Sequence, residues 1–172
     1  LDPLLEEVVP EHLMSEVPLG AFLSGGIDSS LVVAYAARAS QQPVRTFSIG
    51  VNEASQSELP WAAKVAARYR TRHTEKVVAP DLAGLAPRMV AAMEEPVDPF
   101  AVGVYLVSEI TAQQVTVALG GDGGDELFAG YDRYRVEARE RRLELVAAPV
   151  RRLLAVLARR APQGMRGGGF LR

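Results

Sequence analysis

The chain has 172 residues, of which 48% are hydrophobic, a formal net charge of −2 at pH 7 and no cysteine. This length and apolar content suffice for one buried core, so a single main domain is expected. The sequence has no apolar run of about 18 residues and no signal-like start, which argues against a membrane span and against secretion. The lack of cysteine argues against a disulfide framework and thiol chemistry. Together these features favour a cytoplasmic enzyme.

Segments with helix and strand patterns alternate along the first 119 residues. We expect strands at 20–23, 44–50, 74–78 and 115–119. We expect helices near Pro3–Ser15, 28–39, 57–70, 82–93 and 103–113, with Ser57 and Asp81 as N-caps and Pro60 in a first turn. Strands that alternate with helices at this spacing predict an α/β fold with a doubly wound parallel sheet, right-handed crossovers and helices on both faces.

A glycine-rich turn joins the first predicted strand to the next helix, with the sequence Ser24-Gly25-Gly26-Ile27-Asp28-Ser29. Glycines let the backbone pass close to a ligand. The free N–H groups of the helix's first turn point into the same space, where the helix dipole contributes about 0.3–2 kcal/mol towards binding an anion. The turn therefore indicates a site for a polyphosphate.

The same turn lacks the signatures of two common nucleotide loops. It has no Lys followed by Ser or Thr, as a Walker A loop requires, and no G-x-G-x-x-G spacing. An acid at Asp28 would repel a bare phosphate, so the pattern suggests a divalent cation, with Mg²⁺ expected, between the carboxylate and the phosphate oxygens. The alternative is that Asp28 or Ser29 is only the N-cap of the helix.

A second glycine-rich turn follows the strand expected at 115–119, and it carries three acids, Asp122, Asp125 and Glu126. Ligands of open parallel sheets bind beyond the carboxyl ends of the strands, so two such turns can enclose one nucleotide and its metal. The alternative is a flexible acidic loop. An EF-hand is not indicated, because the alternating acids and the distal Glu of its calcium loop are absent.

The last 40 residues are basic, with 11 Arg against 3 acids, whereas residues 1–132 carry 8 Lys or Arg against 18 acids. Arginines interleaved with leucines and valines predict amphipathic helices broken near Pro149. We favour a helix that covers an acidic face of its own protein over nucleic-acid or membrane binding. A disordered end is expected at the glycine-rich residues 164–169.

Four segments together resemble the synthetase domain of glutamine-dependent asparagine synthetases, a family of the ATP pyrophosphatase (PP-loop) superfamily. These segments are 24–29, Phe47-Ser48-Ile49-Gly50, Glu94-Glu95-Pro96-Val97-Asp98-Pro99, and Leu119 to Tyr134. The resemblance implies an adenine nucleotide alpha hydrolase-like fold over residues 1–134, followed by a basic helical tail at 135–172. It also implies that aspartate and ATP form β-aspartyl-AMP, which ammonia converts to asparagine with release of AMP.

The resemblance assigns roles to individual residues. Ser24, Gly25, Gly26 and Ser29 would hold pyrophosphate oxygens, while Asp28 and Asp125 would bind Mg²⁺. Leu23 and Ile49 match positions that contact adenine, with ordinary packing at a strand end as the alternative, and Gly121 matches a place where backbone approaches the nucleotide and the acyl intermediate.

Asp122 matches the position of an acid, often Glu, close to the reacting amine, and is a candidate proton acceptor. Related β-lactam-forming synthetases have a tyrosine there, so an acid favours amide formation between two molecules. Gly120 stands where the family commonly has serine, which removes a hydroxyl from the nucleotide pocket.

Neither the family's glutaminase domain nor its downstream phosphate-binding basic residue is present, so we expect a synthetase-domain fragment that does not hydrolyse glutamine and is too incomplete to be assured of turnover. Two other hypotheses stay open. One is a related amidotransferase that acts on a peptide, sugar or secondary metabolite. The other is a non-catalytic nucleotide- or RNA-binding module.

Overall fold

A computed structural model of the chain describes residues 1–51, 57–79, 81–96, 98 and 101–144, with side chains up to residue 141. The chain forms two compact units, Leu1–Asp122 and Gly123–Arg172. The predicted helix break at Pro149 and the glycine-rich end at 164–169 lie outside the described residues, and the predicted division at residue 134 stays a prediction.

The first unit contains four strands and five helices among its described residues. The strands are β1 (Leu19–Phe22), β2 (Arg45–Val51), β3 (Arg72–Val78) and β4 (Val117–Leu119). The helices are α1 (Asp2–His12), α2 (Ile27–Ala39), α3 (Leu59–Tyr69), α4 (Leu82–Met93) and α5 (Ala101–Thr111). The predicted order of elements is therefore confirmed. The largest difference in their bounds is three residues, at the C-terminal end of α1, which ends at His12 instead of Ser15. Differences of two residues occur at the start of α3, β3 and β4 and at both ends of α5.

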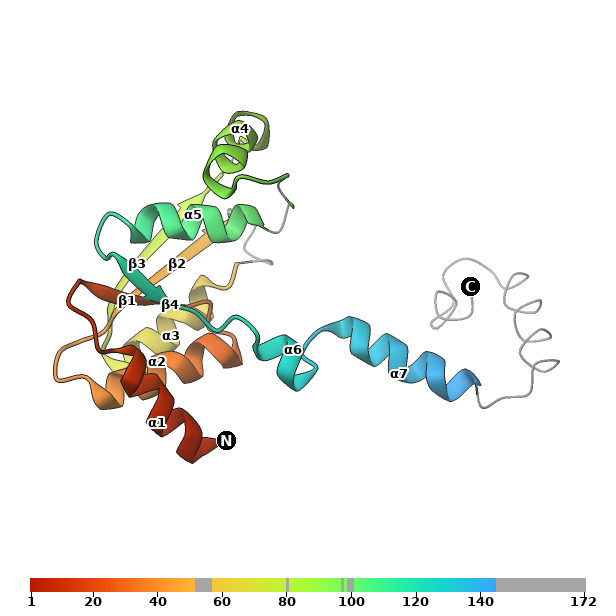
Figure 1. Cartoon of the computed structure of the whole chain (residues 1–172), viewed down its shortest axis with the longest axis horizontal. Coiled ribbons are helices and arrows are strands. Elements are labelled where there is room, and N and C mark those ends of the chain that lie inside the picture. The colour runs from red at the N-terminus through yellow and green to blue at the C-terminus, as the bar shows by residue number, and fades with distance from the viewer. Residues whose placement is uncertain (52–56, 80, 97, 99–100, 145–172) are drawn as a thin grey trace. The chain divides into compact units, whose positions relative to one another are not determined.

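The four strands form one sheet in the order β3-β2-β1-β4, and every neighbouring pair is parallel. Helix α5 contacts β2 on one face, while α2 contacts β1 and α3 contacts β2 and β3. Figure 1 shows the strands between α5 and the pair α2 and α3, with α1 beside α2. The expected parallel α/β sheet with helices on both faces is confirmed.

The order of the strands reverses at β1, because β2 and β3 extend the sheet on one side and β4 is added on the other. The register aligns Ala21 with both Thr46 and Leu119. The turns that follow β1 and β4 consequently leave the sheet at the same edge. In open α/β sheets such a reversal is the place where ligands bind.

The face of the sheet towards α2 and α3 is closed by a compact apolar cluster. It joins Ala21 and Leu23 of the β1 segment to Val33 of α2 and Ala62 and Ala66 of α3. A second cluster, made of Val9, Tyr35, Ala36 and Val44, holds α1 against α2. The small alanines of α3 allow that helix to approach the strands closely.

On the other face, the ring of Phe47 is fully buried and lies over Gly20. A Cβ atom at Gly20 would lie 2.7 Å from the Phe47 ring and 2.9 Å from the Arg45 carbonyl oxygen. Glycine at this position thus lets the central strand accept the largest fully buried side chain of the described core.

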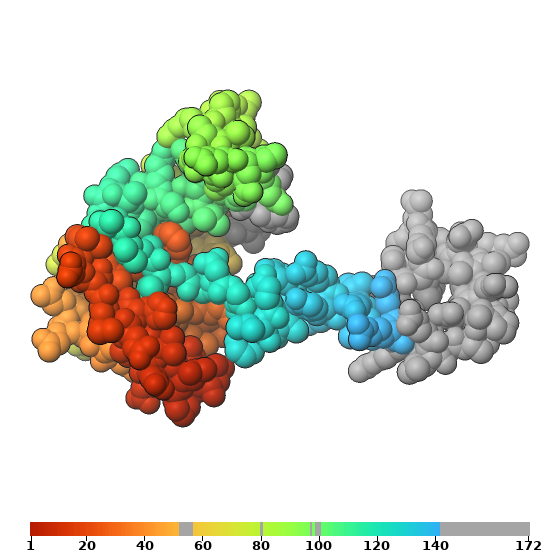
Figure 2. All heavy atoms as spheres, viewed as in Figure 1, coloured from red at the N-terminus to blue at the C-terminus, as the bar shows by residue number. Residues whose placement is uncertain are grey.

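In the second unit, the described helices are α6 (Gly124–Phe128) and α7 (Asp132–Glu144). None of the described side chains of these two helices is buried, and Figure 2 shows their atoms in cyan to blue. Helix α7 is highly charged, with an Arg141–Glu137 ion pair of 2.6 Å one turn apart. Such exposed pairs contribute only about 0.3–0.5 kcal/mol.

We expect the Gly20→Ala substitution to lower the free energy of unfolding by about 1–3 kcal/mol, because the added methyl group overpacks the contact with Phe47 and the Arg45 carbonyl. Gly103→Ala is the matched control, since nothing lies within 4 Å of a Cβ at this position in α5. That change should stabilise the chain by about 0.5–1 kcal/mol. Urea unfolding measures both, and equal stabilities of the two variants would contradict the packing account.

Candidate functional site

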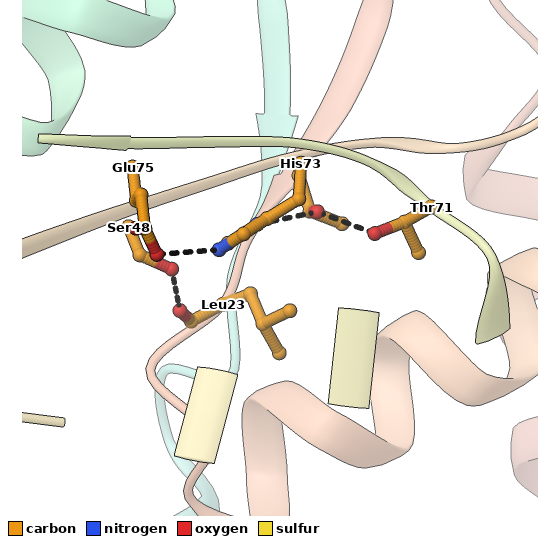
Figure 3. A network of polar contacts seen from close by, with 6 residues as sticks. Leu23, Ser48, Thr71, His73 and Glu75 are labelled. Carbon is orange, nitrogen blue, oxygen red and sulfur yellow. Dashed lines mark hydrogen bonds and ion pairs between the residues drawn. The ribbon is translucent and has the colours of Figure 1, made fainter. Parts of the chain in front are cut away.

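The glycine-rich turn after β1 is anchored at its base by Leu23, which is bonded to β2 through both of its backbone polar groups. Its N–H donates to the Phe47 carbonyl at 2.9 Å, and its carbonyl accepts a hydrogen bond from the buried Ser48 hydroxyl. Figure 3 shows the latter bond beside the strands. The Leu23 side chain is only 1% exposed and belongs to the apolar cluster, so this residue packs in the core.

Within the turn, the hydroxyls of Ser24 and Ser29 lie 2.9 Å apart. The Ser24 N–H donates to the Ser29 hydroxyl at 3.2 Å, and the Gly26 N–H donates to the Ser24 hydroxyl at 3.1 Å. The two serines therefore close the loop on itself and fix its shape. The sequence predicts phosphate binding for these residues, with an N-cap role for Ser29 as the alternative, but it does not indicate the bond between the two hydroxyls.

Helix α2 begins directly after this closed loop, with Gly26 as its N-cap and no side-chain cap. The alternative that Asp28 or Ser29 is the N-cap is therefore wrong. Ile27, Asp28 and Ser29 occupy the first three helical positions, where backbone N–H groups have no acceptor within the helix. These unpaired donors suit an anion such as phosphate.

The first turn of α3 packs against the same loop, a contact that sequence reasoning missed. Gly25 has φ +88°, and a Cβ there would lie 2.5 Å from the Ala62 nitrogen and 2.6 Å from the Trp61 carbonyl carbon. The Trp61 ring is 60% exposed, and the Lys64 ammonium lies 4.0 Å from its centroid. Pro60 marks this helical turn in the sequence, but nothing local indicates which loop it contacts.

The turn after β4 approaches the 24–29 loop from the other side. A Cβ at Gly121 would lie 2.7 Å from the Ser29 nitrogen and 3.0 Å from the Asp28 Cβ. The backbone of Gly121 thus touches the first turn of α2, as expected if two glycine turns border one site. The neighbouring Asp122 is exposed.

Asp28 is half-buried on the first turn of α2, and Ile49 is half-buried in β2. Around the described side chains, no group of three or more His, Cys, Asp or Glu could by itself hold a metal ion. Asp28 is thus a single carboxylate beside unpaired N–H donors. This arrangement fits a cation whose other ligands come from phosphate oxygens and water.

Asp125 belongs to the second unit, where it lies in the first turn of α6. Its carbonyl accepts a hydrogen bond from the Gly130 N–H at 3.0 Å, and its carboxylate lies where a side chain at Gly130 would be. Next to it, the Tyr131 hydroxyl donates to Glu126 at 2.6 Å, which lowers the pKa of Glu126. The joint binding of a metal by Asp28 and Asp125 stays a prediction.

A polar network lies on the face of the sheet that carries Ala21 and Leu23 (Figure 3). The Thr46 hydroxyl lies 2.8 Å from the Thr71 hydroxyl and 2.9 Å from His73 Nδ1. His73 Nε2 is 3.8 Å from the Glu75 carboxylate and has no hydrogen-bond partner in the described chain. Burial lowers the pKa of His73, and Glu75 opposes this effect only in part.

Sequence comparison with known proteins points to a single family. The asparagine synthase family model matches residues 1–169. Asparagine synthetase (glutamine-hydrolyzing) 1 of Bacillus subtilis is 36% identical over 179 residues, which cover 99% of this chain and 28% of that protein. A Mycobacterium tuberculosis homologue named for the same activity is 37% identical over 170 residues, which cover 98% of this chain and 26% of the homologue.

The chain spans about a quarter of the length of these curated relatives. Among solved structures, the NH3-dependent NAD synthetase of Campylobacter jejuni, in complex with the nitrate ion, aligns with a TM-score of 0.49 and 20% identity. That alignment covers 75% of this chain and 58% of the synthetase. In the part of the chain that the structure describes, no helix is long and apolar enough to cross a membrane.

We expect the pKa of His73 to lie below that of a solvent-exposed histidine, about 6.5, because burial disfavours the imidazolium form. The unfolded chain then binds a proton near pH 6.5 while the folded chain does not. The free energy of unfolding should therefore fall as the pH drops below about 6.5, and His73→Asn should flatten this fall. NMR titration, with His12→Asn to assign the two histidine signals, measures the pKa, and a value at or above 6.5 would contradict the burial argument.

Proposed function

The chain belongs to the asparagine synthase family, and from this premise we propose that it carries the ATP-binding part of an aspartate-amidating ligase. In the proposed reaction, the β-carboxylate of aspartate attacks the α-phosphorus of ATP. This attack gives β-aspartyl-AMP and pyrophosphate. Ammonia then attacks the acyl carbon, and the products are asparagine, AMP and a proton.

The observation that carries the proposal is the close approach of Gly121 to the first turn of α2, at the point where the strand order reverses. There the unpaired N–H groups of Ile27, Asp28 and Ser29 form a donor set for a polyanion. We assign the pyrophosphate oxygens to this donor set and to the loop of Ser24, Gly25 and Gly26. The two serine hydroxyls hold the loop in shape.

The donors of this loop are neutral, since residues 24–29 include no Lys or Arg. A bound Mg²⁺ would supply the positive charge that stabilises the departing pyrophosphate. We propose Asp28 and Asp125 as its protein ligands, Asp28 from its place beside the free N–H groups and Asp125 from the sequence resemblance. Leu23 and Ile49 follow as proposed adenine neighbours from the sequence resemblance; Ile49 is half-buried, whereas Leu23 is only 1% exposed.

Asp122 is the proposed proton acceptor for the attacking amine. Its carboxylate is exposed and follows directly after Gly121, so it can accept a proton from a molecule bound beyond the sheet edge. A positioned general base contributes about 10²–10⁴-fold to a rate. The proposed partners of this site are therefore aspartate and ammonia, and the proposed location is the cytoplasm.

Pyrophosphate exchange tests the proposal directly. The longest form of the protein that its gene encodes is incubated with ATP, Mg²⁺ and labelled pyrophosphate, with aspartate or another carboxylic acid added in turn. We expect labelled pyrophosphate to exchange into ATP only when aspartate is the added acid. Exchange with a different acid would instead indicate a related amidotransferase, and salt-sensitive RNA binding without any exchange would indicate a non-catalytic module.

We expect Asp28→Asn to lower aspartate-dependent exchange by about 100-fold or more, because the charge that holds the cation is lost. Asp81→Asn is the matched control, since Asp81 is exposed and, as the N-cap residue of α4, makes no capping hydrogen bond with its side chain. Isothermal calorimetry of ATP binding with and without Mg²⁺ gives a second readout. If the affinity for ATP depends on Mg²⁺ equally in Asp28→Asn and in the unsubstituted protein, Asp28 does not bind the metal.

We expect Asp122→Asn to retain exchange within about twofold and to lower amide formation by about 10²–10⁴-fold, because only the second step uses the proton acceptor. Both rates are measured on the same preparation at saturating ammonia. A parallel loss of both rates would mean that Asp122 serves nucleotide binding instead.

A further inference from the structure

The 24–29 loop contains no basic residue, although the group proposed to bind there is a polyanion. A single Mg²⁺ would neutralise only part of the charge of a departing pyrophosphate, and the unpaired N–H groups of α2 carry partial charges only. A further fixed cation beside the loop would stabilise the leaving group more strongly. Such a cation must come from an element that packs against the loop.

Helix α3 is such an element, and its first turn brings Trp61 to the loop. A Cβ at Gly25 would lie 2.6 Å from both the carbonyl carbon and the Cβ of Trp61. The tryptophan side chain therefore starts in contact with the loop. Because Trp61 is 60% exposed, its ring lies at the surface beside the loop and is not part of the core.

The ammonium group of Lys64 lies over this exposed ring, 4.0 Å from its centroid. Helical side chains tilt towards the N-terminus, and residues three positions apart lie on one face, so Lys64 points back to the turn that contacts Gly25. Lys64 is exposed and forms no hydrogen bond or ion pair with any residue that the structure describes. A single tryptophan side chain thus spans the distance from the loop to a cation that has no anionic partner in the described chain.

We propose that Lys64 is a phosphate-binding residue of this site and that its ammonium group pairs with the pyrophosphate group held by the 24–29 loop. The ring of Trp61 keeps the ammonium beside the loop before the ligand binds. An exposed cation–π contact is weaker than a charge-assisted hydrogen bond to phosphate, so the ammonium leaves the ring when the polyanion arrives. The inference rests on the proposed function and deepens it, since it adds a charged protein group to the neutral donors.

The other lysine of the chain, Lys76, provides a matched control. It is exposed and lies in β3, which is separated from β1 and its loop by β2. Removal of either lysine charge changes the net charge of the protein by the same amount. A comparison of the two therefore separates a local contact from the general attraction of an anion to a more positive protein.

Isothermal calorimetry with Mg²⁺ and inorganic pyrophosphate tests the pairing in the longest form of the protein that its gene encodes. We expect Lys64→Gln to weaken pyrophosphate binding by about 10-fold, because a charge-assisted hydrogen bond is lost. Lys64→Arg keeps the positive charge and should bind within about threefold of the unsubstituted protein. Lys76→Gln should change the affinity by less than about twofold, since an exposed charge far from the ligand is screened by salt.

A chemical footprint on the unsubstituted protein gives a second readout that needs no variant. Acetic anhydride acetylates lysine side chains in their neutral form, and mass spectrometry of the digested protein reports Lys64 and Lys76 separately. With Mg²⁺ present, saturating pyrophosphate should slow the acetylation of Lys64 by about fivefold or more, because an adjacent anion favours the charged, unreactive ammonium. The rate at Lys76 should not change.

The inference is overturned if Lys64→Gln and Lys76→Gln weaken pyrophosphate binding equally, if Lys64→Arg binds as poorly as Lys64→Gln, or if bound pyrophosphate does not protect Lys64 from acetylation. Should Lys64→Gln fail to fold, the footprint alone decides. Absence of both pyrophosphate binding and aspartate-dependent exchange in the unsubstituted protein would contradict the proposed function itself. Normal binding and exchange with an unprotected Lys64 would contradict this inference alone.

Discussion

The parallel pairing of β1 with both β2 and β4 is the constraint on which the candidate site depends. Parallel strands end at one edge of the sheet, so the register that aligns Ala21 with Leu119 brings two distant glycine turns to the same edge. Bonds from Leu23 to Phe47 and Ser48 hold the end of β1 in this register. The unpaired N–H groups of α2 then face the space beside the second turn.

Close backbone approach is the second condition, and three glycines satisfy it. Gly20 accepts the Phe47 ring, Gly25 accepts the first turn of α3, and Gly121 accepts the first turn of α2. A side chain at any of them would meet backbone or ring atoms that cannot move without shifting a whole element. Close packing at these points joins β1, its loop and the two adjacent helices at one edge of the sheet, and the proposed phosphate site depends on such preorganised support.

The sheet also contains buried polar groups, an unusual feature of parallel strands, which are ordinarily apolar on both faces. Thr46 and Ser48 are buried in β2, and each hydroxyl has a partner, Thr71 or His73 for the first and the Leu23 carbonyl for the second. A paired polar group in the core costs little, whereas an unpaired one costs about 1–3 kcal/mol. The Ser48 bond also connects the polar part of the core to Leu23, at the base of the 24–29 loop.

The sequence by itself determined the order of strands and helices, because hydrophobic periodicity and turn residues are local properties. It also determined the two glycine turns and their acids, since the residues of the proposed phosphate and metal site are contiguous in each turn. Only the tertiary structure decided that Gly26 caps α2, that Ser24 and Ser29 bond to each other, and that α3 packs on Gly25. These features depend on contacts between segments far apart in the chain or on the exact start of a helix.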